Sequence, residues 1–226
     1  MRKRIKITSE ELLSRYAAGE RNFTGIRIKM QRMLSADLSG VDLSGADFSG
    51  ADLSGADFSE ANLSGADLSG ADLSTDFSGA NLSKAVLSGA ILTEACLSQA
   101  ILTEANLSGA SMFQVEMVGT NLIKAKLSGA NLGYSKLVEA NLSGANLSGA
   151  ELLSVNFDDA ILVDTDLRNA NLTFAILSGV DLRGSNLEGA VLVEANLIGA
   201  NIEGVDLERV KLSNTVMPDR SIRTNR

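Results

Sequence analysis

Histidine and cysteine, two residue types that often carry enzyme chemistry, are nearly absent from this 226-residue chain. It contains no histidine, so the commonest general base and metal ligand is missing. Its single cysteine, Cys96, stands at a position expected to face water and has no histidine to activate it. Gly45 and Gly50 have the glycine spacing of a phosphate-binding loop, but Ala51-Asp52 follows where that loop needs Lys and then Ser or Thr. The sequence therefore predicts no catalytic residue, no metal site and no bound cofactor.

The other polar residues follow a repeat of five residues, which is clear from Ala36 onward as ADLSG, VDLSG, ADFSG and further copies. We number the central Leu or Phe of each unit i; position i−2 is mostly Ala, i−1 mostly Asp or Asn, and the last two positions mostly Ser and Gly. A period of five fits neither an α-helix nor a continuous strand. Positions i−2 and i alternate with a polar residue as in a strand, and Ser and Gly favour turns. Each unit is therefore expected to form one straight side and one corner, with i−2 and i inside.

Tandem units of the form A(D/N)LSX extend from Arg21 to Asp219 and resemble the pentapeptide-repeat family. The resemblance implies an all-β solenoid, namely a right-handed quadrilateral β-helix with four units to a coil and about ten coils. At the usual strand spacing, ten coils would make a rod about 48 Å long. The segment SEELLSRYAAGERNF, residues 9–23, further resembles the N-terminal segment of cyanobacterial members.

Residues 1–20 are expected to form an N-terminal tail and a short α-helix that caps the first coil. Ser9 would be the N-cap of this helix, and Gly19 would end it. The apolar face that covers the coil would consist of Leu12, Leu13 and Tyr16.

The β-helix is expected over residues 21–219 and a C-terminal tail over residues 220–226. Only a short polar tail, SIRTNR, is available at this end, so the last coil would be either covered by a turn of the tail or left partly open. Family members that dimerise do so through apolar C-terminal elements. No such helix is visible here, which favours a monomer.

The repeat arrives one residue early once, at ADLS-TDFSG, because the unit that contains Leu73 lacks its fifth residue. Counting four units to a coil through this deletion places Thr75 at i−2 and Phe77 at i. Phe77 would then stack on Phe58 in one interior column. We interpret the deletion as a tolerated corner variant; the alternative is a kink that a partner recognises.

Charge divides the chain into a basic start and an acidic rod. Residues 1–35 hold nine basic and three acidic residues, whereas residues 36–80 hold nine acidic residues and no basic one. Asp oxygens that accept N–H groups at the corners would explain the acidic residues structurally. The alternative is DNA mimicry, since some pentapeptide-repeat proteins bind DNA gyrase through an acidic rod. The candidate acidic surface consists of three columns: Asp37, Asp57 and Asp76; Asp47 and Asp67; and Asp52 and Asp72.

Apolar residues replace the polar consensus on the outside of adjacent coils near the middle of the chain. A contiguous apolar belt of this kind is typical of a protein-binding site, although Val and Ile also suit extended backbone. The candidate partner-binding residues are Ile91, Cys96, Ile101, Phe113, Val118, Ile123 and Tyr134.

The sequence as a whole predicts a non-enzymatic interaction scaffold or regulator that binds a protein partner through the side wall of the solenoid. Direct binding to nucleic acid or to a membrane is not expected. The alternative is an acidic DNA mimic that inhibits or protects a DNA-binding enzyme such as gyrase. The first residues contain no apolar run long enough for a signal peptide, and one cysteine forms no internal disulfide, which favours the cytoplasm.

Overall fold

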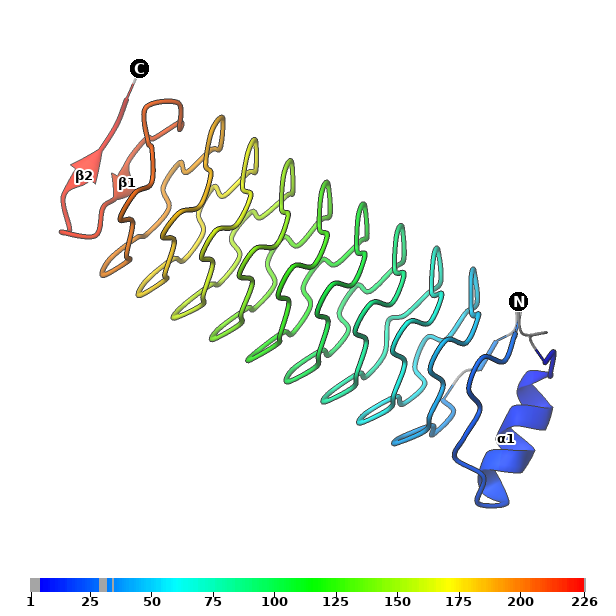
Figure 1. Ribbon diagram of the computed structural model, residues 1–226. Helices are drawn as coiled ribbons and strands as arrows, with labels where there is room; N and C mark the ends of the chain where they lie inside the picture. The colour runs from blue at the N-terminus through cyan, green and yellow to red at the C-terminus, as the bar shows by residue number, and fades with distance from the viewer. Residues whose placement is uncertain (1–4, 29–31, 34, 226) are drawn as a thin grey trace.

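The computed structural model describes residues 5–28, 32–33 and 35–225, which form a rod of stacked coils (Figure 1). The named elements lie at its two ends. Helix α1 (Ser9–Ala17) covers the N-terminal end, and strands β1 (Thr215–Val216) and β2 (Ile222–Arg223) form a hairpin at the C-terminal end.

Each side of a coil pairs with the same side of the next coil by a parallel bridge between i−1 residues. The step between bridged residues is twenty along most of the rod, as from Asn121 to Asn141, so four units of five make one coil. Across the deletion the step falls to nineteen, and Asp57 pairs with Asp76. The predicted four-sided register, including its shift at the deletion, is confirmed.

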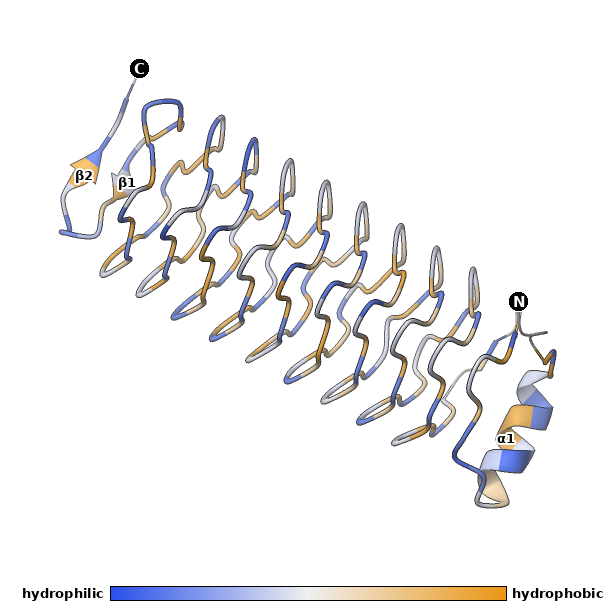
Figure 2. Cartoon of the chain, viewed as in Figure 1, coloured by the Kyte–Doolittle hydropathy of each residue, from blue (hydrophilic) through white to orange (hydrophobic). Residues whose placement is uncertain are grey.

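The interior of the rod is filled by the side chains at i−2 and i. Ala140 and Leu142 of one mid-rod unit are both completely buried, and the same pair of positions is buried in nearly every described unit. The resulting alternation of apolar and polar residues along each side is visible in Figure 2. Phe58 and Phe77 stack inside one column, with ring centroids 5.4 Å apart and an interplanar angle of 9°. Burial of each Leu side chain stabilises the fold by about 1.5–3 kcal/mol.

The polar positions build the corners. The side-chain oxygen at i−1 accepts the backbone N–H of residue i+1 and in many units its hydroxyl as well, as Asn141 Oδ1 does from Ser143 N at 3.0 Å and Oγ at 2.7 Å. The next residue, at i+2, takes a left-handed backbone with φ near +60°, which Gly adopts without strain, for example Gly144 with φ 67°. Local hydrogen bonding thus explains the Asp/Asn, Ser and Gly of the repeat.

The deletion removes the left-handed residue from one corner. Ser74 O still accepts the N–H of Gly55 at 3.1 Å, so pairing with the preceding coil continues into the shortened corner. Thr75 occupies the i−2 position and is 8% exposed, and its buried hydroxyl oxygen finds no hydrogen-bond partner among the described residues. The shortened unit therefore costs one hydroxyl interaction but keeps the stack.

Helix α1 is the predicted N-terminal cap, with one correction at its start. Its N-cap is Thr8, not Ser9, because the Thr8 hydroxyl accepts the N–H of Glu11 at 3.1 Å and Ser9 is already helical. Leu12 is completely buried against the first coil, and Leu13 and Tyr16 pack on the core. The Tyr16 hydroxyl also donates to Ser39 O at 2.8 Å.

Of two further features near the ends, the first was not predicted and the second decides between the two predicted alternatives. Lys6 pairs with Arg27 in parallel, so the chain adds a strand-like segment to the first coil before α1 begins. At the other end the tail covers the last coil instead of leaving it open. Ile222 of β2 pairs with Val216 of β1, and Asn225 donates from Nδ2 to Val210 O at 2.6 Å.

Candidate protein-binding corner

The structure does not bring the seven candidate partner-binding residues together on one surface. The bridges place Ile91, Cys96 and Ile101 on three successive sides of one coil. Val118 and Ile123 lie at two successive corners of the next coil, because each follows the central residue of a different side. The residues form a ring around the rod, so a single flat partner surface could contact only part of them.

One corner does gather apolar residues. Phe113 and Tyr134 lie at the corner between the sides of Ile91 and Cys96, one coil apart, with ring centroids 5.4 Å apart in an edge-to-face contact. The same corner continues with apolar residues in each of the next three coils. We define this set as the aromatic corner: Phe113, Tyr134, Leu153, Phe174 and Val193.

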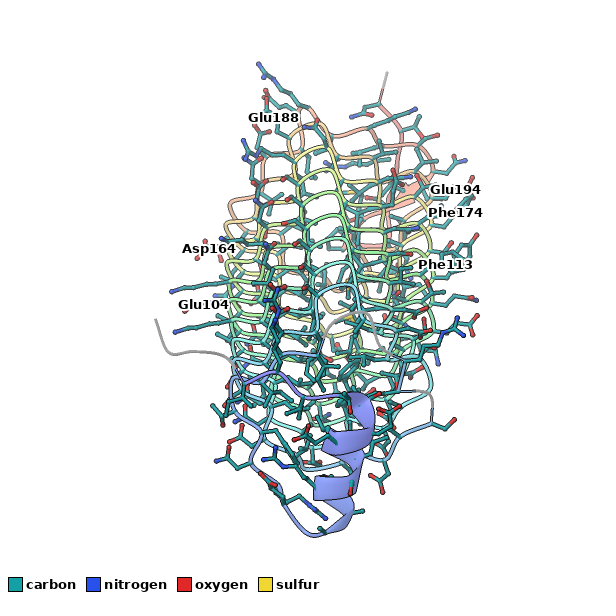
Figure 3. The ribbon with its side chains drawn as sticks, turned by 90° about the vertical axis from the view of Figure 1, so that its right-hand side faces the viewer. Glu104, Phe113, Asp164, Phe174, Glu188 and Glu194 are labelled. Carbon is teal, nitrogen blue, oxygen red and sulfur yellow. The ribbon has the colours of Figure 1, made fainter. Side chains whose placement is uncertain are left out.

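The aromatic corner forms one long edge of the rod. Figure 3 shows Phe113 and Phe174 on the same edge, while Glu104 and Asp164 point from the opposite edge. Tyr134 is 50% exposed and Phe174 is 48% exposed, and Leu153 and Val193 are half-buried. Ile176, on the adjoining side, is also exposed. Apolar side chains thus form a ridge along five coils, which spans about 19 Å at the strand spacing.

Local geometry at the start of the ridge favours the aromatic contact. Residue i+1 of the corner above Phe113 is Gly133 instead of the usual Ser, and a Cβ atom there would come within 3.4 Å of the Phe113 ring. The ring therefore lies over the backbone of Gly133 and against Tyr134.

Two residues of the ridge hold a backbone conformation that bulky side chains avoid. Tyr134 has φ 61° and Phe174 has φ 60°, in the left-handed region where Gly is unstrained. Other non-Gly corner residues share this backbone, but most have polar side chains, such as Glu94 with φ 60°. Strain of this kind costs about 1 kcal/mol or more and is frequent at functional sites.

The deletion lies on the same corner, at Ser74, two coils before Phe113. The corner therefore departs from the consensus in two ways. It has the glycine consensus at Gly55, then the missing residue, and then the run of apolar residues. The sequence prediction did not connect the deletion with the apolar residues, because the two fall on one corner only when the coil register is counted through the deletion.

The acidic residues occupy the predicted columns but do not form one surface. The bridges confirm that Asp37, Asp57 and Asp76 share one side, whereas Asp47–Asp67 and Asp52–Asp72 belong to two other sides. Part of the charge is compensated by the preceding coil. Arg27 Nε lies 3.1 Å from Asp47 Oδ2, Arg32 Nε lies 3.0 Å from Asp52 Oδ2, and Asp47 is only 4% exposed.

Hydrogen bonds at the corners also stabilise the ionised carboxylates. The pKa of Asp37 is lowered chiefly by the backbone N–H of Ser39, and the pKa of Asp52 chiefly by the hydroxyl of Ser54. The hydrogen bonds at Asp37 and Asp52 therefore support the structural explanation, in which these residues are corner acceptors.

A thiol site, a metal site and a membrane span have little support in the described residues. Cys96 is half-buried, and its Sγ lies 3.1 Å from Ser78 Oγ. The described residues contain no cluster of three or more His, Cys, Asp or Glu side chains that could hold a metal ion. Within the same residues, no helix has the length and apolar content needed to cross a membrane.

Sequence reasoning missed three members of the aromatic corner, namely Leu153, Phe174 and Val193. The signal was available, because apolar residues at i+1 or i+2 recur about every twenty residues from Phe113 onward. A spacing of twenty residues indicates neighbours only in a coil of four five-residue sides. The sequence prediction instead grouped residues that are close along the chain, and such residues lie around the rod as a ring.

Comparison with known proteins agrees with this architecture. The sequence model for pentapeptide repeats matches in eight copies over residues 36–74, 75–109, 100–133, 135–173 and 175–214. No curated protein matches the chain. HetL, a pentapeptide repeat protein involved in heterocyst differentiation regulation from the cyanobacterium Nostoc sp. strain PCC 7120, is 38% identical. Its solved structure aligns over 96% of this chain and 100% of HetL, with a TM-score of 0.56.

Two other solved structures show weaker likeness. A pentapeptide repeat protein from the thylakoid lumen of Arabidopsis thaliana is 31% identical over 47% of this chain and 71% of its own, with a TM-score of 0.36. Full-length QnrB1, a plasmid-mediated fluoroquinolone resistance protein, is 21% identical over 83% of this chain and 94% of its own, with a TM-score of 0.34. The repeat match and the likeness to HetL confirm the predicted right-handed four-sided β-helix. The chain belongs to the pentapeptide-repeat family.

Proposed function

We propose that this protein is a non-enzymatic cytoplasmic regulator that acts by binding a protein partner through the aromatic corner. The observation that carries the proposal is the run of aromatic and aliphatic side chains along one corner, from Phe113 to Val193, of which Tyr134 and Phe174 are exposed and the others half-buried. Exposed Tyr and Phe side chains are frequent at the centre of protein interfaces, because they bury a large area with little loss of conformational freedom.

The surroundings of the corner fit an interface with a polar rim. On one adjoining side Lys136 Nζ lies 3.1 Å from Glu116 Oε2, and on the other Asn171 Nδ2 donates to Glu151 Oε2 at 2.9 Å. Glu194, at the far end of the ridge, points to solvent from the same edge as Phe174 (Figure 3). A convex apolar ridge between polar sides matches a partner groove of complementary shape.

The relationship to HetL supports a regulatory role. HetL is involved in the regulation of heterocyst differentiation, and the similarity to HetL covers 96% of this chain. A repeat protein with an extended side wall would regulate by contact with another protein. The proposal takes from HetL only this class of function.

The test starts with affinity capture of the partner from the source organism and continues with the purified partner. Replacing Phe113, Tyr134 and Phe174 by Ser should raise Kd by at least about tenfold, because loss of central aromatic contacts costs more than 1 kcal/mol each at many interfaces. Circular dichroism should be unchanged, since these side chains lie outside the coil.

The matched control replaces Ile101, Ile123 and Ile161 by Ser, which removes an equal number of apolar side chains from a side and a corner that do not adjoin the aromatic corner. This variant should bind with a Kd close to that of the wild type. Equal loss of binding in both variants would contradict a single-corner site. Loss of binding in Asp57→Asn with Asp76→Asn, together with a steep dependence on salt, would instead support acidic mimicry.

A further inference from the structure

The pairing between the last two coils is interrupted on one side. On the preceding side the ladder is intact, because Leu182 N donates to Asn201 O at 2.8 Å and Asn201 N donates to Val180 O at 2.8 Å. The next side should pair Ser185–Leu187 with Asp206 in the same way. Within the described part of the chain, however, the Leu187 N–H, the Ser185 carbonyl and the Asp206 N–H make no hydrogen bond.

An irregular corner accounts for the interruption. At most corners the N–H at i+2 donates to the carbonyl at i+1 of the next coil, as Gly179 donates to Ile198 O. Gly189 donates instead to Arg209 O, one residue later, at 2.9 Å. Arg209 stands at i+2 without the left-handed backbone of the other corner residues. The segment before it therefore leaves the stack, and Figure 1 shows this part of the chain as a wider loop near the C-terminal end.

The two separated segments enclose a cleft of about 460 Å³. Its walls are residues 185–188 on one coil and Gly204, Asp206, Glu208 and Arg209 on the next. This volume lies within the range of roughly 300–1,000 Å³ that is usual for ligand sites. The cleft is thus bordered by a strand edge whose backbone groups have no partner from the neighbouring coil.

The charge of the cleft is negative. Glu188, Asp206 and Glu208 line it together with one basic residue, Arg209. Arg209 Nη1 already lies 2.6 Å from Glu188 Oε1, which leaves Asp206 and Glu208 without an ion pair among the described residues. Both residues are exposed; Asp206 Oδ1 accepts the N–H of Glu208 at 2.8 Å, and its other oxygen and the Glu208 carboxylate can meet a cation that enters the cleft.

We infer that this cleft binds an extended, basic peptide segment of a partner protein, which adds a strand to the open edge at Ser185–Leu187. Strand addition to an unpaired sheet edge supplies main-chain hydrogen bonds, and side chains set the preference for sequence. Lys or Arg side chains of the segment would pair with Asp206 and Glu208. The cleft lies on a different corner from Val193, although the aromatic corner ends on the same coil, so the two sites use different residues.

The test uses fluorescein-labelled synthetic hexapeptides and the full-length protein. A peptide of alternating Lys and Val should bind, as measured by fluorescence anisotropy, and the corresponding peptide of Glu and Val should not. A Lys-Val peptide that is N-methylated at alternate residues keeps its charge but cannot pair as a strand, so it should lose binding. Equal binding of the methylated and unmethylated peptides would overturn strand addition.

The cleft itself is tested by Asp206→Asn with Glu208→Gln. The control, Glu94→Gln with Glu139→Gln, removes two exposed carboxylates elsewhere. The cleft variant should raise Kd about tenfold and the control less than about twofold. In the wild type, saturating peptide should slow hydrogen exchange of the Leu187 amide at least about tenfold. The proposal would be overturned if the cleft variant and the control had equal Kd values for the peptide, or if the peptide left the exchange rate of the Leu187 amide unchanged.

Discussion

At the i+2 position of a corner, the backbone requirement and the side chain can conflict. The corner needs φ near +60°, where Gly is the least strained residue, yet Tyr134 and Phe174 occupy two such positions on the aromatic corner. Neither ring contributes to the interior column, because both residues are about half exposed. Folding alone would favour Gly at these positions, and the aromatic side chains therefore suit a role in binding.

The conflict predicts an unusual order of stability at Phe174. The free energy of unfolding should be about 1 kcal/mol higher for Phe174→Gly than for Phe174→Ala, because Ala keeps the left-handed strain and Gly relieves it. At Phe113, which lies at i+1 without positive φ, the order should reverse and Ala should be the more stable replacement. Urea denaturation of the four variants measures both differences. If Ala were more stable at both positions, strain at Phe174 would not be the explanation.

Substitutions at the interior positions should cost more stability than substitutions at the corners. Leu142 is completely buried in a stacked column, so Leu142→Ala should destabilise the protein by about 2–5 kcal/mol. Asn141 beside it accepts two hydrogen bonds at a half-buried corner, and Asn141→Ala should cost about 1–2 kcal/mol. Chemical denaturation of the two variants compares these costs, and equal effects would contradict the inward placement of position i.

At the scale of elements, the repeat predicts the sides but not the ends. The period of five fixes which residues point inward, whereas the ends depend on single contacts that have no repeat. The N-cap is one example, because Thr8 and Ser9 are both good N-cap residues and only the hydrogen bond to Glu11 decides between them. The tail is another, since Asn225 reaches back to Val210 across many residues.

The N-terminal cap carries a prediction of its own. Deleting residues 1–20 removes α1 and the segment that pairs with Arg27, and so exposes the edge of the first coil. An exposed edge offers free N–H and C=O groups to another molecule, and the truncated protein should form oligomers or aggregates. Light scattering measures this outcome, with Leu13→Ala as a control that keeps the cap. A truncated protein that stays monomeric with an unchanged Tm would show that α1 does not protect the edge.

At the scale of the whole molecule, the sequence predicted the coil but only two members of the candidate site, Phe113 and Tyr134. The coil follows from local rules that repeat in every unit, so a single register describes most of the rod. The aromatic corner depends on residues about twenty positions apart, such as Phe113 and Tyr134, which become neighbours only after the coils are stacked. The open cleft at Asp206 depends on one irregular corner at Arg209, and no local pattern of residue types predicts that corner.

Because each coil contacts only its neighbours, a change in one corner should stay local. Inserting Gly after Ser74 restores a five-residue unit at the deletion, and the added residue can take the left-handed backbone that the corner lacks. The free energy of unfolding should remain within about 1 kcal/mol of the wild type or rise. Inserting Gly after Ser108, where Gly109 already completes the corner, should destabilise the protein because it adds a sixth residue to a unit. Urea denaturation distinguishes the two variants, and equal destabilisation would mean that the shortened corner is not equivalent to a missing fifth residue.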